Sequence, residues 1–116
     1  MMDIHGKKLI ALAGYDTFGK AFINVVNQEI ADKKLFVIGI NINEEDFGFF
    51  INNLAHSKVE VTIFMPEFQE MAAKHFGLDG FLLIAYKDGD KLSFVTANEK
   101  TSIDDRALLQ LIQRIT

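Results

Sequence analysis

The chain has no cysteine, no tryptophan and a single proline among its 116 residues. Without thiols it can form neither a disulfide scaffold nor a cysteine-ligated zinc site, and every reaction that uses a thiolate is excluded. It also lacks an apolar run near the ~20 residues that a membrane-spanning helix requires. Acidic residues outnumber basic ones 16 to 12. We therefore expect no nucleic-acid surface, which depends on clustered lysine and arginine.

What the chain does have is the composition of one globular domain. Apolar residues make up 49% and charged residues 24% of it, which excludes a disordered tail. The length predicts a single domain over residues 1–116. Residues 1–8 lack the apolar segment of a signal peptide, so we expect a cytoplasmic protein. A removed leader, or excision from a longer protein, would leave the same sequence.

Hydrophobic periodicity predicts nine elements in the order β-α-β-α-β-α-β-β-α. Strands are predicted over residues 7–14, 35–42, 58–64, 81–86 and 91–96. Helices are predicted to begin near Thr17, Asn43, Met65 and Ser102. Asp-Gly at 88–89 is a strong hairpin signal between the last two strands. Alternating strands and helices indicate a parallel sheet covered on both faces, with an antiparallel strand in the closing hairpin.

Each helix carries an apolar stripe that we expect to face the sheet. The stripes are Phe18, Phe22, Val25, Val26 and Ile30; Phe47, Phe50, Ile51, Leu54 and Ala55; Phe68, Met71, Ala72 and His75 or Phe76; and Leu108, Leu111, Ile112 and Ile115. Asp16 or Thr17 is expected to cap the first helix, and Ser102 the last. Pro66 suits the first position of the third helix and Gly77 its end.

The element order resembles the thioredoxin plan, in which a β-α-β half is followed by a helix, a β-hairpin and a last helix. Local similarity lies in residues 26–31 with 34–37 and 41–43, in 75–80 before 81–84, and in the turn 87–90. Residues 44–64 resemble the insertion of peroxiredoxins and membrane-anchored thiol-disulfide oxidoreductases. The resemblance implies a three-layer α/β sandwich with a mixed five-stranded sheet. Its strand order would be the insertion strand, the second strand, the first strand and then the hairpin pair.

The family's redox chemistry does not carry over to this chain. The Cys-x-x-Cys motif falls on Thr17-Phe18-Gly19-Lys20, so disulfide exchange is impossible. The cis-proline before the hairpin is missing as well, because Gly80 is followed directly by Phe81. The chain therefore resembles a cysteine-free, degenerate thioredoxin-like protein. Domains of extracellular-matrix and sushi-repeat proteins are similar in losing the thiols while keeping a Lys-Asp-Gly hairpin.

The loop after the first strand is the candidate binding site. It lies at the carboxyl end of a central strand and before a helix, where open parallel sheets bind ligands and where backbone N–H groups attract anions. The candidate residues are Tyr15, Asp16, Thr17, Phe18, Gly19 and Lys20. Three interpretations stay open: a capped turn with Phe18 in the core, a surface for a partner, or a small-anion site with Thr17 and Lys20.

Other polar groups predict no catalytic, cofactor or metal site. His5, His56 and His75 lack the spacing of metal ligands, and Ser57 beside His56 does not form a triad. The acids at 44–46 suit a helix N-terminus. The periodicity does not place Phe49, Phe18 and Phe64 firmly in the core, and together at the surface they would form an interaction patch.

These observations favour a non-catalytic module that binds another protein or a second copy of itself, with no membrane and no nucleic acid as partner. One alternative rests on Val59-Glu60-Val61-Thr62-Ile63, which resembles the strand entering the substrate site of the N-terminal domain of shikimate dehydrogenases. It implies a small-ligand-binding or enzyme-derived open α/β domain. The lysine expected just after that strand is missing, since Phe-Met-Pro-Glu follows at 64–67, and the cofactor domain would lie elsewhere. A structural domain of a larger assembly is the third possibility.

Overall fold

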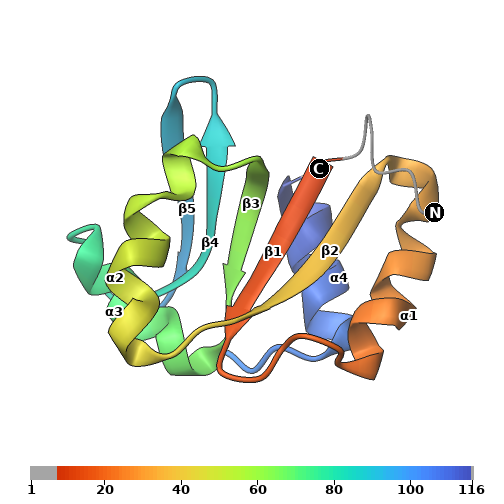
Figure 1. Ribbon diagram of the computed structural model, residues 1–116, viewed down its shortest axis with the longest axis horizontal. Coiled ribbons are helices and arrows are strands. Elements are labelled where there is room, and N and C mark those ends of the chain that lie inside the picture. Colours follow the sequence, from red (N-terminus) through yellow and green to blue (C-terminus); the bar gives the residue numbers. More distant parts are fainter. Residues whose placement is uncertain (1–7, 116) are drawn as a thin grey trace.

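The computed structural model describes residues 8–115 as a mixed sheet of five strands between two layers of helices (Figure 1). The strands are β1 (Lys8–Gly14), β2 (Leu35–Asn41), β3 (Val59–Phe64), β4 (Phe81–Asp88) and β5 (Lys91–Ala97). The helices are α1 (Ala21–Glu29), α2 (Glu44–Asn52), α3 (Pro66–His75) and α4 (Asp105–Ile115), with the short 3-10 helices η1 (Ala31–Lys33) and η2 (Leu54–His56). The predicted order of elements and the α/β class are confirmed. No helix in the described part is long and apolar enough to span a membrane.

The strand order is β2-β1-β3-β4-β5, which differs from the order that the thioredoxin resemblance implied. β1 pairs in parallel with both β2 and β3, and β3 pairs antiparallel with β4. The strand that was read as part of an insertion therefore lies in the middle of the sheet, between β1 and the hairpin. Its last residues Thr62, Ile63 and Phe64 are all buried, as expected of a strand covered on both faces.

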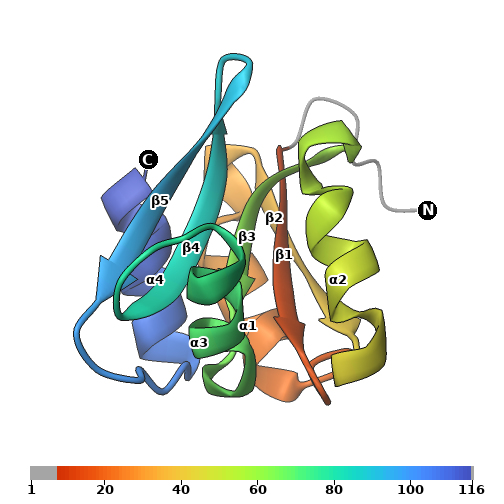
Figure 2. The same ribbon diagram turned by 90° about the vertical axis from the view of Figure 1, so that its left-hand side faces the viewer.

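Each face of the sheet carries one hydrophobic cluster beneath two helices (Figure 2). Helices α1 and α4 cover the face that includes Ile10 and Leu12 of β1. Helices α2 and α3 cover the opposite face, where Phe47, Phe64 and Phe68 pack together and two of their rings stack at 5.0 Å. The fully buried phenylalanines therefore lie in the layer under α2 and α3, whereas the buried side chains of the other layer are aliphatic.

Two predicted helix caps are wrong because other side chains occupy those positions. α1 starts after Lys20, which makes no side-chain cap bond, and Thr17 turns into the protein instead. The start of α4 is capped by Asp104, whose carboxylate accepts from the Ala107 N–H at 2.8 Å, and not by Ser102. Pro66 does occupy the first position of α3, and Gly77 has the positive φ of 68° typical of a helix end.

The apolar stripe of the first helix is only partly as predicted. Val26 and Ile30 are buried together with Ile23, and Phe22 is half-buried against them, but Val25 is 46% exposed. Phe18 lies outside α1 and is 75% exposed. The other predicted stripes face the core with smaller deviations: Met71 is half-buried, and Ala55 and His75 are exposed.

Hydrophobic periodicity does not predict the burial of one polar side chain in α3, that of Gln69. Gln69 is fully buried, and its Nε2 donates to the carbonyls of Phe64 and Thr101 at 2.9 and 2.8 Å. Its Oε1 accepts from the Thr101 N–H at 2.8 Å. These bonds fasten the irregular segment between β5 and α4 to the end of β3.

Candidate functional site

The three parallel strands β1, β2 and β3 end together at one edge of the sheet, at the bottom in Figure 1. Gly14 pairs with Asn41, and Ala13 pairs with Phe64. We call the surface formed by residues 14–20, 41–44 and 65–67 the carboxyl-end corner. Open α/β sheets bind ligands at this end of their strands, so the predicted loop 14–20 lies where a site is expected.

The buried side chain of Thr17 connects the loop of this corner to the strands. It is 1% exposed, and its hydroxyl donates to the Ile40 carbonyl at 2.8 Å while lying 3.0 Å from the Leu12 carbonyl. Thr17 is thus a positioning residue that joins β1 and β2, and its hydroxyl does not face a ligand.

Asn41 of β2 accepts hydrogen bonds from the backbone N–H groups that an anion would need. Its Oδ1 accepts from the N–H groups of Thr17 and Phe18 at 2.7 and 2.8 Å. The ammonium group of Lys20 lies 3.2 Å from the Asp16 carboxylate. The Thr17 and Phe18 amides and the Lys20 side chain therefore already have internal partners, which disfavours the small-anion interpretation.

Two glycines let the loop lie close against the strands. A Cβ at Gly39 would lie 2.5 Å from the Thr17 carbonyl oxygen, and one at Gly14 would lie 2.6 Å from Cγ of Met65. Both distances are shorter than real Cβ contacts, so any larger residue would displace the loop or Met65. The loop is fixed by this close approach as well as by Thr17 and Asn41.

Tyr15 joins the loop to two carboxylates. Its N–H donates to Glu67 at 2.9 Å, and its phenol O–H donates to Glu44 at 2.7 Å. The ring packs edge-on against Phe68, with centroids 4.9 Å apart. The hydrogen bond to Glu44, together with the negative charges of Glu44 and Glu67, raises the pKa of the Tyr15 phenol above its usual value.

The outer surface of the corner combines exposed rings with negative charge. Phe18 is 75% exposed and Tyr15 is 46% exposed, so the interpretation that places Phe18 in the core is wrong. Among residues 8–115, neither Glu44 nor Glu67 forms an ion pair. The corner therefore offers carboxylate oxygens and aromatic faces to a ligand.

The remaining candidates lie apart from this corner. Phe49 on α2 is 78% exposed, whereas Phe64 is fully buried, so the two do not share a surface patch. His56 ends η2 and His75 ends α3, while His5 lies outside the described residues. No group of three or more histidine or acidic side chains within residues 8–115 is placed to hold a metal ion.

The acids at 44–46 occupy the first turn of α2, as predicted, behind an Asn43 side chain that accepts from the Asp46 N–H at 3.0 Å. Sequence reasoning did not find the additional role of Glu44 as the partner of Tyr15. It also missed Asn41 and Glu67. The available signal was that Asn41 is the polar residue near the end of the second predicted strand, and that Glu67 follows Pro66 in the first turn of the third predicted helix.

No protein-family model matches the chain, and no curated protein matches it. Among solved structures, the chain is similar to shikimate dehydrogenase 1 from Peptoclostridium difficile, with a TM-score of 0.59 and 10% sequence identity. The similarity covers 75% of this chain and 36% of that one, so the chain corresponds to about a third of the enzyme. At this identity, the likeness shows the fold alone.

This neighbour and the strand order both correct the thioredoxin interpretation. A cysteine-free thioredoxin would place β3 outside β2, whereas the structure places it between β1 and β4. The similarity instead agrees with the alternative drawn from residues 59–63, an open α/β domain of the kind found in shikimate dehydrogenases. The chain is a mixed α/β domain that shares its fold with part of a shikimate dehydrogenase.

Proposed function

We propose that the chain is a small-molecule-binding domain of enzyme-derived fold that binds its ligand at the carboxyl-end corner without a reaction of its own. The observation that carries the proposal is the rigid arrangement of Tyr15, Glu44 and Glu67 at the ends of three parallel strands. This is the place at which open α/β sheets hold their ligands. The fold shared with part of a shikimate dehydrogenase supports the same interpretation.

The charges of the corner define the chemical class of ligand. One oxygen of each carboxylate bonds to Tyr15, and the second oxygens are acceptors for hydroxyl or ammonium donors. The exposed rings of Tyr15 and Phe18 suit the apolar face of a sugar-like or cyclic compound. We therefore propose a neutral or cationic small molecule rich in hydrogen-bond donors.

Shikimate itself does not fit these charges. The enzyme neighbour is named for this compound, which carries a carboxylate as well as hydroxyl groups. In the corner that carboxylate would meet Glu44 and Glu67, while the nearby Lys20 is already paired with Asp16. Like charges at short range disfavour binding, and the sequence at 64–67 supplies no lysine to offset them.

Chemical-shift perturbation of the 15N-labelled protein tests this proposal with three probes: myo-inositol, ethanolammonium and shikimate. We expect the neutral or cationic probe to shift the amides of residues 15–18, 44 and 67 saturably, and shikimate to act at least about tenfold more weakly. The double variant Glu44→Gln and Glu67→Gln should lose the response. Glu99→Gln, at an exposed position elsewhere, is the matched control. Equal binding of shikimate, or no response to either other probe, overturns the proposal.

Self-association is a second candidate function, favoured by the two exposed phenylalanines Phe18 and Phe49. Beside Phe49, an apolar groove of about 280 Å³ runs between β2 and α2, with Ile40 and Ile42 on its strand side. Large exposed apolar side chains are common at interfaces. If a second copy binds in this groove, sedimentation velocity should show a concentration-dependent dimer that Phe49→Asp abolishes. A wild-type monomer at every concentration excludes this candidate.

A further inference from the structure

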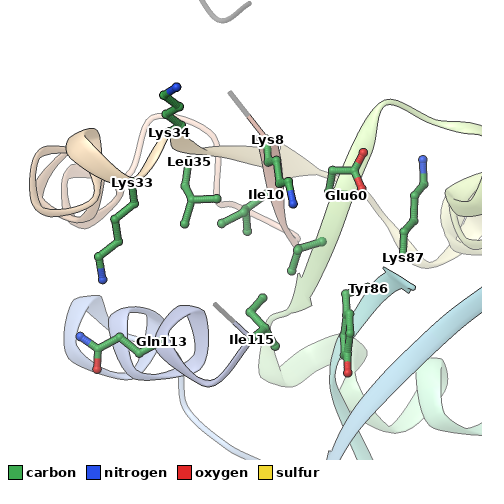
Figure 3. Close-up of a pocket in the computed structure, with 11 residues that line it drawn as sticks. Lys8, Ile10, Lys33, Lys34, Leu35, Glu60, Tyr86, Lys87, Gln113 and Ile115 are labelled. Carbon is green, nitrogen blue, oxygen red and sulfur yellow. The ribbon is translucent and has the colours of Figure 1, made fainter. Parts of the chain in front are cut away.

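A second hollow of the described surface lies at the opposite end of the sheet from the carboxyl-end corner. It has a volume of about 800 Å³, within the usual range for small-molecule sites. It lies beside the amino-terminal ends of β1, β2 and β3 and beside the end of α4 (Figure 3). We call it the amino-end hollow.

The floor of the amino-end hollow is apolar. It is formed by side chains from four strands and one helix: Ile10, Leu35, Val61, Tyr86 and Ile115. Ile10 and Leu35 are buried in the core under α1 and α4, whereas Val61, Tyr86 and Ile115 are partly buried against that core and supply the apolar surface of the floor. Apolar surface of this kind favours a ligand with a hydrocarbon or aromatic body.

The rim of the hollow is basic, in contrast to the net charge of −4 of the whole chain. Four lysines line it, at 8, 33, 34 and 87, against one carboxylate, Glu60. In Figure 3, Lys8 and Lys33 extend toward the enclosed space, whereas Lys34 and Lys87 extend away from it. The Lys87 ammonium group donates to the Ser57 carbonyl, which accounts for its direction.

The backbone joins the two segments that carry Lys8 and Lys33. The Lys8 N–H donates to the Lys34 carbonyl at 2.9 Å, which ties the start of β1 to the end of η1. Lys34 is the one non-glycine residue of the described chain with a positive φ, at 59°, and this turn directs the chain from η1 into β2. Within residues 8–115, neither Lys8 nor Lys33 has an ion-pair partner.

From this arrangement we propose that the amino-end hollow binds a small anionic amphiphile, such as an aliphatic or aromatic carboxylate. The apolar body lies on the half-buried Val61, Tyr86 and Ile115, and the carboxylate lies at the rim, where Lys8 and Lys33 supply positive charge. The Gln113 amide at the end of α4 is a further donor on the opposite rim. This site is separate from the carboxyl-end corner, so it does not depend on the function proposed there.

Octanoate, octylammonium and acetate test the proposal, because each of the last two shares one property of octanoate, either its tail or its charge. We expect octanoate to shift the amides of residues 8–10, 33–35, 61, 86 and 113 saturably in 15N-correlated spectra. Octylammonium shares the tail but reverses the charge, and acetate shares the charge without the tail, so neither should bind there. Raising the salt concentration from 50 to 500 mM should weaken octanoate, because the lysines are exposed.

The double variant Lys8→Gln and Lys33→Gln should raise the dissociation constant of octanoate about three- to tenfold, which corresponds to two exposed ion pairs. Lys91→Gln with Lys100→Gln removes the same charge at exposed positions outside the hollow and is the matched control. Equal binding of octylammonium, or an octanoate response that the double variant does not change, overturns the proposal. NOE contacts that placed residues 1–7 of the chain in the hollow would overturn it as well.

Discussion

Thr17 shows how a single buried hydroxyl organises the carboxyl-end corner. It connects two strands at a point where the chain has just left β1 and has not yet entered α1. A hydroxyl buried without a partner costs free energy, whereas one that bonds to buried carbonyls stabilises the fold. Thr17 therefore contributes to the conformation of the loop and not to contacts with a ligand.

The substitution Thr17→Val keeps the shape of the side chain and removes the hydrogen bond. We expect it to lower the free energy of unfolding by about 1–2 kcal/mol, because the carbonyls of Leu12 and Ile40 lose a donor. Urea denaturation with an unchanged m-value measures the effect. Thr96→Val, on the exposed side of β5, should change the free energy by less than about 0.5 kcal/mol. Equal effects of the two variants would contradict the role given to Thr17.

The pKa of the Tyr15 phenol reflects the negative charges of the corner. Its raised pKa means that the phenol keeps its proton to a higher pH in the folded protein than in the unfolded chain. The stabilising bond to Glu44 is therefore complete below the unfolded pKa of about 10 and is lost as the pH rises through the folded value.

Ultraviolet titration of the Tyr86→Phe variant, which leaves Tyr15 as the one tyrosine of the sequence, measures this pKa directly. We expect a midpoint above the ordinary value of about 10. Adding Glu44→Gln should lower the midpoint, since the charge and the strongest hydrogen bond are removed. A midpoint that does not move with Glu44→Gln would show that the carboxylate does not hold the phenol in solution.

At the scale of elements, the outer edge of β2 is closed by the helix that precedes it. Asn27 of α1 donates from Nδ2 to the Val37 carbonyl at 3.0 Å and accepts from the Val37 N–H at 2.7 Å. The Asn27 side-chain amide thus makes the two hydrogen bonds that a neighbouring strand would make with Val37, in the middle of the apolar edge strand β2. Open edges of this kind pair with other chains unless they are covered.

Replacing Asn27 with alanine uncovers this edge. We expect Asn27→Ala to self-associate through β2, because the Val37 N–H and carbonyl lose their partners while the apolar strand remains. Sedimentation velocity at increasing concentration measures the change. Asn24→Ala, at an exposed position on the same helix, should leave the wild-type behaviour unchanged. If both variants sediment as the wild type does, the edge is protected by something other than Asn27.

The elements themselves were predictable because their signals are local. Apolar runs, the Asp-Gly turn, Pro66 and Gly77 act over a few residues, and the structure has the corresponding strands and helix ends. The strand order was not predictable, because the same sequence of elements is compatible with β3 outside β2 or beside β1. Ile63 and Phe64 are adjacent apolar residues that face opposite sides of the sheet, and both are buried. Two such residues in succession were the available signal for a central strand.

The position of the candidate site within the fold was predictable, but its internal contacts were not. The loop 14–20 follows from the rule that ligands bind at the ends of parallel strands. Its partners Asn41, Glu44 and Glu67 are far away along the chain, and nothing local relates them to Tyr15 or Thr17. The buried Gln69 is a further case, since a polar residue within a helix ordinarily faces water.

At the scale of the whole molecule, stability should decrease from the centre of the sheet to its edges. The completely buried stretches Ile10–Ala13 and Ile63–Phe64 belong to β1 and β3, whereas β5 is mostly half-buried and pairs on one side alone. Segments with many buried apolar contacts open only with global unfolding.

Hydrogen–deuterium exchange tests this distribution. We expect the hydrogen-bonded amides of β1 and β3 to exchange with the free energy of global unfolding, and those of β5 to exchange faster through local opening. Exchange at several denaturant concentrations separates the two regimes. Equal protection of β5 and β1 would show that the sheet opens as one cooperative unit from edge to edge.

The order β2-β1-β3-β4-β5 also has a consequence for the chain as it leaves the ribosome. Once β1 and β2 have paired, every later strand joins the same side of the sheet in the order in which it is synthesised. The other side is closed early, because Asn27 and Val37 are both present as soon as β2 is complete. The nascent sheet therefore grows in one direction. At each stage it has a single unpaired edge, which the next strand to be synthesised covers.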